Sequence, residues 1–459
     1  MKTPDFDTIT RRRFLLGLLG GAASALTWGC IPGRSSSAAG RPPNIVLVLA
    51  DDLGYGDLGC YGQKRFETPR ADRMAKEGVR FTQFYSGAPI CAPSRTSLLT
   101  GRHAGHISIR TNDDPIFQET GPTCAGVLRE RGYATGVFGK WGLGDENGAG
   151  APDLAGFDEF FGYLDHRAAH RQRPGSLWEN RRRVKLPPET YAHDRIVERA
   201  LGFVRENRDR PFFLLLAPTL PHPDLDVPEE VLRLFRGRYP EVPYVQTAGK
   251  EYLSQPTPRA AYAAMVHMID RDVGRLLDLL RELGLDEKTL VMLTSDNGAG
   301  RAGGSDPLFF DSWGPFEGRK RTLYEGGIRV PLVARWPGMI PAGAVCARTG
   351  GLWEMLPTFA EVAGAPAPPN GDGASLLPLL GGGARPDPAF FYWEMHRPHM
   401  VQAVRLDDWK GIRDDRDGSF ELYDLGKDVG EKNDVARDHP ETVRRMTEIM
   451  RSAHVPLSR

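Results

Sequence analysis

The chain has 459 residues, and its 59 Lys and Arg residues balance its 59 Asp and Glu residues, so the formal net charge is zero. Binding to a nucleic-acid backbone favours a basic surplus, and its absence here argues against nucleic acid as a partner. Hydrophobic residues make up 40% of the chain, which is typical of a globular protein long enough for one large α/β domain and a smaller second domain.

Residues 1–40 are predicted to be an export signal and tether outside the fold. Residues 10–15, with Arg11 and Arg12, are similar to a twin-arginine signal, although a disordered basic leader is the alternative. The apolar stretch 14–26 is too short and too rich in glycine to cross a membrane as a stable helix. Cys30 follows a sequence similar to a lipid-attachment site. We therefore expect an exported protein, either free in the periplasm or anchored to the membrane as a lipoprotein through Cys30.

The cysteine pattern indicates neither a zinc cluster nor a disulfide framework. The chain has five cysteines and no Cys-x-x-Cys pair. Cys30 and Cys91 lie in motifs of their own. Cys60, Cys124 and Cys346 are therefore predicted to be buried or partly buried thiols.

Short apolar runs alternate with amphipathic helices through the middle of the chain. Strands are predicted at 44–49, 79–86, 134–138, 212–216, 290–293 and 330–334. The clearest helix is predicted over 260–283, where apolar residues recur at spacings of three and four. This alternation predicts an α/β fold with a large, mostly parallel sheet and helices on both faces.

Polar residues follow four of these predicted strands. Asp51 and Asp52 follow 44–49, Lys140 follows 134–138, His222 comes shortly after 212–216, and Asp296 and Asn297 follow 290–293. In open α/β sheets, ligands bind beyond the carboxyl ends of the strands, so we expect these segments to converge at one edge. The three aspartates and the asparagine offer only oxygen ligands, which favours Ca²⁺, with Mg²⁺ as the alternative, over zinc. Without a cation, three crowded carboxylates would raise one another's pKa values.

A further segment combines a thiol with helix-start chemistry. Cys91 follows the predicted strand 79–86, and the run Cys91-Ala92-Pro93-Ser94-Arg95 opens into Thr96-Ser97-Leu98-Leu99-Thr100-Gly101. The N-terminus of a helix favours anions, and Arg95 would add a positive charge one turn further on. A nucleophile beside such a site suits transfer chemistry on an anionic group.

This run, from Cys91 to Gly101, resembles the signature of the type I sulfatases, in which this cysteine is converted to formylglycine. Further similarity extends from about residue 43 to residue 440. The resemblance implies an alkaline phosphatase-like fold, with a catalytic domain at 41–365 and a smaller C-terminal α+β domain at 366–459 built on a short antiparallel sheet. It also implies a formylglycine-generating or maturase enzyme as a partner during biosynthesis.

The resemblance assigns roles to individual residues. Asp51 and Asp52 match the opening motif that binds the metal, and Asp296 and Asn297 match the segment that supplies the other ligands beside residue 91. The sulfate-contacting lysines correspond to Lys140 and Lys320, with Arg95 beside the nucleophile, and the histidine near the leaving oxygen corresponds to His222.

One position departs from the family pattern. The usual Gly-Lys-Trp-His-Leu-Gly reads Gly139-Lys140-Trp141-Gly142-Leu143-Gly144 here, so the histidine beside the nucleophile is missing. We hypothesise that His170 occupies the vacancy from the loop that follows, with His166 the less favoured candidate.

The C-terminal part is predicted to contain short strands at 390–394, 400–405, 409–413 and 421–425 and a last helix over 440–453. Residues 365–370 read as a linker. We expect this part to pack on the large sheet and to shape the substrate mouth, without chemistry of its own.

The predicted function is hydrolysis of a sulfate ester of a carbohydrate or an aryl alcohol, using formylglycine at position 91 and a divalent cation. Two alternatives stay open. The first is a phosphonate monoester or phosphodiester hydrolase with the same site, and the second is a catalytically dead protein that binds sulfated glycans. The sequence does not identify the ester or the oligomeric state.

Overall fold

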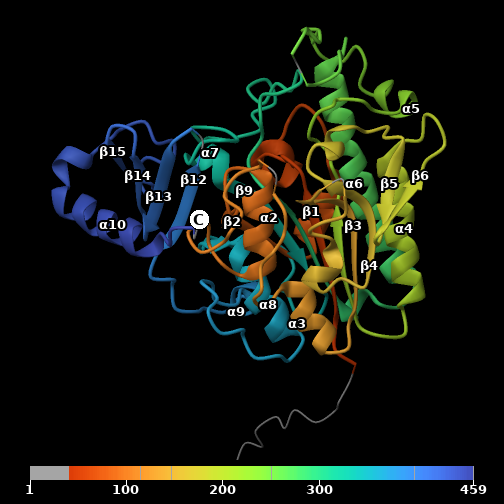
Figure 1. The fold of residues 1–459 in the computed structure, drawn as a ribbon, viewed down its shortest axis with the longest axis horizontal. Coiled ribbons are helices and arrows are strands. Elements are labelled where there is room, and N and C mark those ends of the chain that lie inside the picture. The colour runs from red at the N-terminus through yellow and green to blue at the C-terminus, as the bar shows by residue number, and fades with distance from the viewer. Residues whose placement is uncertain (1–40, 114, 146, 250, 397, 458–459) are drawn as a thin grey trace, which may run out of the picture. The chain divides into compact units, whose positions relative to one another are not determined.

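The computed structural model describes residues 41–113, 115–145, 147–249, 251–396 and 398–457. They belong to one compact unit, Arg41–Arg459, shown in Figure 1. The predicted export signal and Cys30 lie outside the described residues, and the boundary predicted between residues 365 and 366 stays a prediction. No helix in the described ranges is long and apolar enough to cross a lipid bilayer.

The predicted large sheet is confirmed, with the strand order β10-β2-β9-β8-β1-β7-β3-β4-β5-β6 and with β11 paired to β2. Its central strands β8, β1, β7, β3 and β4 run parallel to one another, while β9 pairs antiparallel with β8 and the hairpin β5–β6 pairs antiparallel with β4. The strands are β1 (Asn44–Ala50), β2 (Val79–Tyr85), β3 (Ala134–Gly144), β4 (Glu159–Asp165), β5 (Ser176–Glu179), β6 (Arg182–Lys185), β7 (Phe212–Ala217), β8 (Thr289–Ser295), β9 (Arg329–Arg335), β10 (Ala344–Cys346) and β11 (Gly350–Gly351).

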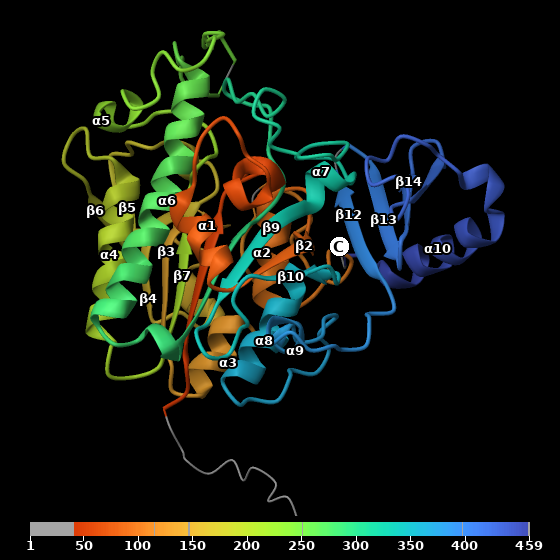
Figure 2. The same ribbon diagram turned by 180° about the vertical axis from the view of Figure 1, so that it is seen from behind.

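Helices cover both faces of this sheet, as the sequence predicts (Figure 2). One face packs against α1 (Pro69–Lys76), α4 (Ala192–Glu206) and α6 (Pro258–Glu282), and the other packs against α2 (Cys91–Thr100), α3 (Cys124–Glu130) and α8 (Met355–Val362). Shorter helices are α5 (Glu229–Leu232), α7 (Glu325–Ile328) and α9 (Leu377–Leu380), with 3-10 turns at Tyr55–Asp57, Gly59–Tyr61, Pro152–Ala155, Ala168–His170, Asp286–Lys288, Leu352–Glu354 and Ala436–Asp438.

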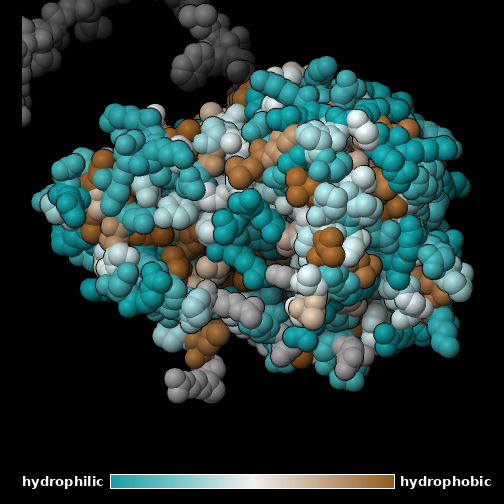
Figure 3. Space-filling view, turned by 90° about the horizontal axis from the view of Figure 1, so that it is seen from above, coloured by the Kyte–Doolittle hydropathy of each residue, from teal (hydrophilic) through white to brown (hydrophobic). Residues whose placement is uncertain are grey.

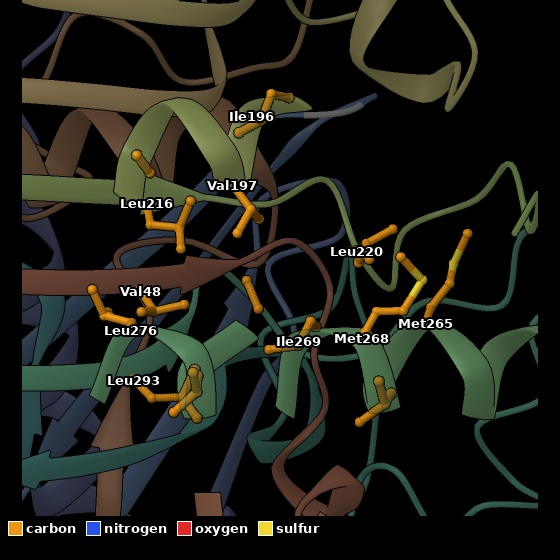
Figure 4. Close-up of a cluster of buried hydrophobic side chains, with 14 of the residues drawn as sticks. Val48, Ile196, Val197, Leu216, Leu220, Met265, Met268, Ile269, Leu276 and Leu293 are labelled. Carbon is orange, nitrogen blue, oxygen red and sulfur yellow. The ribbon is translucent and has the colours of Figure 1, made fainter. Parts of the chain in front are cut away.

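The central strand β1 divides its side chains between two cores. Val46 and Val48 face α1, α4 and α6, whereas Ile45 and Leu47 face α2, α3 and α8. This follows from the alternation of side chains along a strand, and burial on both faces explains why β1 is apolar throughout. Figure 4 shows the first core, in which Val48 lies among side chains of β7, β8, α4 and α6. The strand is therefore fixed between its neighbours, and so are the residues that follow it.

A second, antiparallel sheet is formed by β12 (Phe391–His396), β13 (Met400–Leu406), β14 (Trp409–Asp414) and β15 (Phe420–Asp424). The helix α10 (Pro440–Ala453) covers one face. The other face packs through Trp393 against Tyr85 and Trp353 of the large-sheet region. The C-terminal strands and helix predicted from the sequence are thus confirmed. Strand β4 and the hairpin β5–β6 are present in the structure but not predicted from the sequence.

The free thiols agree with the cysteine prediction, because Cys124 is buried and Cys60 and Cys346 are partly buried.

A buried ion cluster joins the second sheet to the segment that leads into α7. Lys410 of β14 is fully buried, and its Nζ lies 2.9 Å from Glu325 and 2.8 Å from Glu431. The same Glu325 accepts a 2.6 Å hydrogen bond from the Tyr85 hydroxyl at the end of β2. Since β2 leads into Cys91, the second sheet helps to hold the strand that positions this residue.

Replacing Lys410 with alanine should lower the free energy of unfolding by about 3–5 kcal/mol, because two buried carboxylates would lose their shared cation. Urea denaturation followed by circular dichroism measures this. The control is Lys427→Ala, which removes an exposed partner of Asp424 and should cost less than about 1 kcal/mol. Equal losses in the two variants would contradict a structural role for the cluster.

Candidate active site

The segments predicted to converge are brought together at the carboxyl ends of neighbouring parallel strands. Strand β1 lies between β7 and β8, so Asp51 and Asp52 meet Asp296 and Asn297 on one side and residues 220–222 on the other. Lys140 lies within β3, on the far side of β7.

Cys91 is the first residue of α2, and it faces the aspartates. Side-chain ligand atoms of Asp51, Asp52, Cys91 and Asp296 all lie within 4.8 Å of one another. The Sγ atom of Cys91 is 3.4 Å from Asp51 Oδ1 and 4.0 Å from Asp52 Oδ1. All four side chains are buried. Asp52 adopts a left-handed backbone conformation with φ of 67°, which is uncommon outside glycine and aims the carboxylate into the cluster.

Each of the three carboxylates is paired with its own cationic side chain. Lys140 Nζ lies 2.7 Å from Asp51, Arg95 Nε donates to Asp296 at 2.9 Å, and Lys320 Nζ lies 2.6 Å from Asp52. Lys320 also lies 3.2 Å from the Sγ of Cys91. The buried charges are therefore matched one to one around residue 91, as buried ions require.

Burial and mutual repulsion shift the pKa values of the cluster. Burial and the neighbouring Asp51 raise the pKa of Asp296 to about 6. Burial also acts to raise the pKa of Asp51, but Lys140 and the other nearby cations hold it well below its usual range. The pKa of the Cys91 thiol is raised by burial and by the adjacent carboxylates.

The cluster fits a hard divalent cation. Three carboxylates converge on one point, and the Oδ1 atom of Asn297 is buried there without a hydrogen-bond partner among the described residues. The amide nitrogen of Asn297 donates to Asp52 at 2.6 Å, so the amide belongs to the same cluster. An all-oxygen set beside a single cysteine suits Ca²⁺ or Mg²⁺ better than zinc. The residues that would hold the cation are Asp51, Asp52, Asp296 and Asn297, next to residue 91.

Histidines form the opposite wall of the site. His222 Nε2 lies 3.8 Å from Asp52 Oδ2, while its Nδ1 lies 2.5 Å from the carbonyl oxygen of Pro223. The His170 ring stacks on His222 with centroids 4.5 Å apart, and His170 Nδ1 lies 2.6 Å from Glu251. Burial and the neighbouring lysines lower the pKa of His222.

The position beside Gly142 is occupied by His166 rather than His170. A Cβ atom at Gly142 would lie 3.9 Å from His166 Nδ1, and this Nδ1 is buried with no hydrogen-bond partner within the described ranges. His166 Nε2 lies 3.3 Å from the side-chain amide of Asn112, whose oxygen accepts from the Ala92 backbone at 3.0 Å. His170 stacks on His222 and its Nδ1 contacts Glu251, while its Nε2 is also buried without a partner among the described residues. Proximity to Gly142 therefore favours His166, the second candidate, over His170 for this position.

These residues open into a cavity of about 670 Å³. Its lining includes Asp52, His166, His170, His222 and Lys320. Asn112 and Tyr252 line it as well, and neither carries a sequence signal that would have selected it. Of the candidate residues from the sequence, Asp52, His170, His222 and Lys320 line this cavity. The others belong to the buried cluster that Asp52 and Lys320 share, and they are Asp51, Cys91, Arg95, Lys140, Asp296 and Asn297.

Fold and site together define a hydrolase with a buried acidic metal cluster next to a cysteine at a helix N-terminus. A profile of the sulfatase family matches residues 43–365, and a profile described as the C-terminal part of N-sulphoglucosamine sulphohydrolase matches residues 312–454. The chain therefore belongs to the sulfatase family, whose members hydrolyse sulfate esters and generally use a metal ion.

Characterised relatives and solved structures agree with this membership. The chain is 36% identical to N-acetylgalactosamine-6-sulfatase of the dog, over 82% of this chain and 73% of the relative. It is 34% identical to human arylsulfatase A, over 81% and 75%. The crystal structure of Ps i-CgsB in complex with k-i-k-neocarrahexaose superposes with a TM-score of 0.74 at 29% identity, covering 89% and 93%. Family membership supports the enzyme over the alternative of a dead binding protein.

Adding Ca²⁺ or Mg²⁺ to chelator-treated protein should raise its melting temperature. A ligand that binds only the folded chain stabilises it by about 2.7 kcal/mol at a hundredfold excess over Kd. Asp296→Ala should lose this cation-dependent shift, and calorimetry with each cation measures it. Asp415→Ala, an exposed aspartate between β14 and β15, is the control and should keep the shift. An undiminished shift in Asp296→Ala would rule out this site.

Proposed function

We propose that this sulfatase acts on a carbohydrate sulfate ester with residue 91 in the formylglycine form and with Ca²⁺, or alternatively Mg²⁺, bound by Asp51, Asp52, Asp296 and Asn297. The observation that carries the proposal is the 4.8 Å cluster that unites Cys91 with three carboxylates. In the active enzyme, the hydrated aldehyde would supply a hydroxyl nucleophile and the cation would polarise it and the sulfuryl oxygens.

The basic residues of the cluster are placed to bind a sulfate group next to residue 91. Lys320 Nζ already lies 3.2 Å from Sγ of this residue, and Lys140 Nζ contacts Asp51 of the same cluster at 2.7 Å. Both can donate to sulfuryl oxygens as negative charge builds up on them in the transition state. Arg95 is fixed by Asp296 and by the Lys140 carbonyl oxygen at 2.7 Å, so it mainly orients the cluster.

His222 is proposed to assist departure of the alcohol. Its Nδ1 is engaged by the Pro223 carbonyl oxygen, and this leaves Nε2 facing Asp52 and the cavity. From there the ring can contact the ester oxygen and supply a proton or a hydrogen bond as the bond to sulfur breaks. The ring of His170, stacked on His222 and anchored by Glu251, restrains it in this orientation.

His166 is proposed to take the part that the absent side chain at Gly142 would otherwise play. Its unpartnered Nδ1 is directed to the space beside Lys140, and Asn112 holds its other nitrogen. Asn112 also binds the backbone of Ala92, so the imidazole is coupled to the start of α2. This arrangement suits a group that orients or deprotonates the nucleophile at residue 91.

The proposal also requires maturation and export. Because Cys91 is fully buried in the folded chain, a formylglycine-generating or maturase enzyme would have to act before this segment packs. The predicted export signal at residues 1–40, with Cys30 as a candidate lipid anchor, would then deliver the enzyme to the periplasm or the membrane surface.

Cys91→Ala should abolish sulfate release while leaving the melting temperature and its dependence on Ca²⁺ close to those of the parent protein. The reason is that only the nucleophile is removed, and the carboxylates and their cationic partners remain. Ion chromatography of sulfate released from a panel of sulfated sugars measures the turnover. Mass spectrometry of the peptide that contains residue 91 reports the modification in the parent protein. Substantial turnover by the alanine variant would refute the mechanism.

His166→Ala should lower kcat by about 10²–10⁴ if its imidazole acts as an acid or base, and added imidazole should restore part of the loss. His170→Ala serves as the matched comparison and should cost less, since it affects the reaction only through His222. Steady-state kinetics with both variants, with and without imidazole, makes the distinction. A larger loss of kcat in His170→Ala than in His166→Ala would show that His170 is the acid or base.

A phosphonate monoester or phosphodiester hydrolase remains the second candidate function. Its substrates offer the same tetrahedral anionic oxygens to Lys140 and Lys320, so the cluster itself does not reject them. Parallel kcat/KM measurements on aryl sulfate and aryl phosphonate esters separate the two activities, and the sulfate ester should be preferred.

A further inference from the structure

The mouth of the active-site cavity carries four exposed arginines that the mechanism above does not use. Arg167 lies in the loop after β4, Arg301 follows β8, and Arg319 and Arg321 precede α7. All four line the cavity, although they come from three separate segments of the chain. The face viewed in Figure 3 is predominantly hydrophilic.

The side chains of these four arginines have no hydrogen-bond or ion-pair partner among the described residues, and they gather at one cavity. None of the four guanidinium groups makes a hydrogen bond or an ion pair within the described parts of the chain. The chain as a whole has a net charge of zero, so four arginines at one cavity are a local excess of positive charge. Some exposed arginines elsewhere are paired, as Arg236 is with Glu229 at 2.5 Å and Arg181 is with Asp153 at 2.6 Å, whereas Arg445 on α10 also has no partner among the described residues. Of the acidic residues in the wall, Asp52 is engaged by Lys320 and Glu251 by His170, although the charge of Arg167 also acts on Glu251. Asp113 lines the cavity as well.

The backbone fixes two of these arginines relative to the reacting centre. Lys320, between Arg319 and Arg321, points inward to Asp52 and Cys91, while its two neighbours are exposed at the mouth. The Lys320 amide donates to the Ala299 carbonyl at 3.1 Å and the Arg321 amide donates to the Pro89 carbonyl at 2.9 Å. The segment is therefore tied on both sides, which fixes the backbone of Arg319 and Arg321 at the cavity that Lys320 enters.

The wall also offers an aromatic surface. Tyr252 is partly buried, and its ring centroid lies 5.8 Å from that of His170 and 6.0 Å from that of His222. A ring of this kind can pack against the apolar face of a sugar while charged groups around it bind the substituents.

We propose that the substrate is an anionic glycan with at least one further sulfate or carboxylate near the scissile sulfate, and that Arg167, Arg301, Arg319 and Arg321 bind these additional anions. This inference rests on the proposed function, because it concerns the same cavity. Guanidinium groups match the geometry of sulfate and carboxylate oxygens, and unpaired ones need not give up an internal partner to bind them. The lining carries more cationic than acidic side chains, and such an excess raises the rate at which an anionic substrate arrives.

The first test compares kcat/KM of the matured enzyme for three disaccharides. The first carries one sulfate group, the second carries two, and the third carries one sulfate group and a uronate carboxylate. We expect the doubly anionic substrates to be preferred at low salt, and this preference to shrink as ionic strength rises. The disulfated and uronate-bearing substrates distinguish sulfate from carboxylate as the second anion. Equal kcat/KM for the singly and doubly anionic substrates at low salt would overturn the proposal. Absence of sulfate release from all three would instead speak against the proposed function.

The second test uses the double variant Arg319→Ala/Arg321→Ala. It should reduce the ratio of kcat/KM between the disulfated and the monosulfated disaccharide by on the order of tenfold, because each exposed pair contributes up to about fivefold. Arg445→Ala on α10 is the matched control, since it removes an exposed arginine far along the chain from the cavity, and it should leave the ratio unchanged. A ratio unaffected by the double variant would contradict the assignment.

A binding measurement keeps the inference testable without turnover. Isothermal titration of the disulfated disaccharide into the Cys91→Ala protein should give a Kd about tenfold lower than in the same protein with Arg319→Ala/Arg321→Ala added. The monosulfated disaccharide should show a smaller difference. Equal Kd values in the two backgrounds would overturn the role of the arginines even if sulfate ester hydrolysis is confirmed.

Discussion

The structure depends on the balance of charge around residue 91. Three buried carboxylates lie within reach of one thiol, and each is held by a different cation. Removing ions of this kind from water is costly, so they are tolerated only with close partners and a rigid surrounding. The parallel strands β1, β7 and β8 supply that rigidity, because both faces of the sheet are buried by helices. The sheet and its covering helices therefore hold the residues of this cluster in place.

The second sheet also helps to hold the cluster in place, although it does not contact the cluster directly. Its Lys410 and Trp393 contact Glu325 and Tyr85, and these residues belong to the segments that carry Lys320 and Cys91. The C-terminal part thus supports the site without donating a group to it. The expectation that it also shapes the substrate mouth is not met, because the residues that line the cavity all lie between Asp52 and Arg321.

The cationic side chains of the site form two groups that differ in burial and in pairing. Lys140 and Lys320 are buried and neutralised by carboxylates, so they are positioned for a single sulfate group at the reacting centre. The arginines at the mouth are exposed and unpaired among the described residues, so they are available to groups further along a substrate. The buried lysines would therefore take part in the reaction, and the exposed arginines would select the substrate.

The sequence by itself determined which strands are followed by polar residues, the helix start at Cys91 and the oxygen-rich ligand set, because each of these depends on a short local pattern. It did not reveal strand β4 or the hairpin β5–β6, and it favoured His170 over His166 beside Gly142. Only the tertiary structure decided that choice, since the direction of each imidazole depends on Asn112 and Glu251, which approach from distant segments. The unpaired state of the arginines was equally out of reach, because the presence or absence of a partner is set by packing and not by the residue itself.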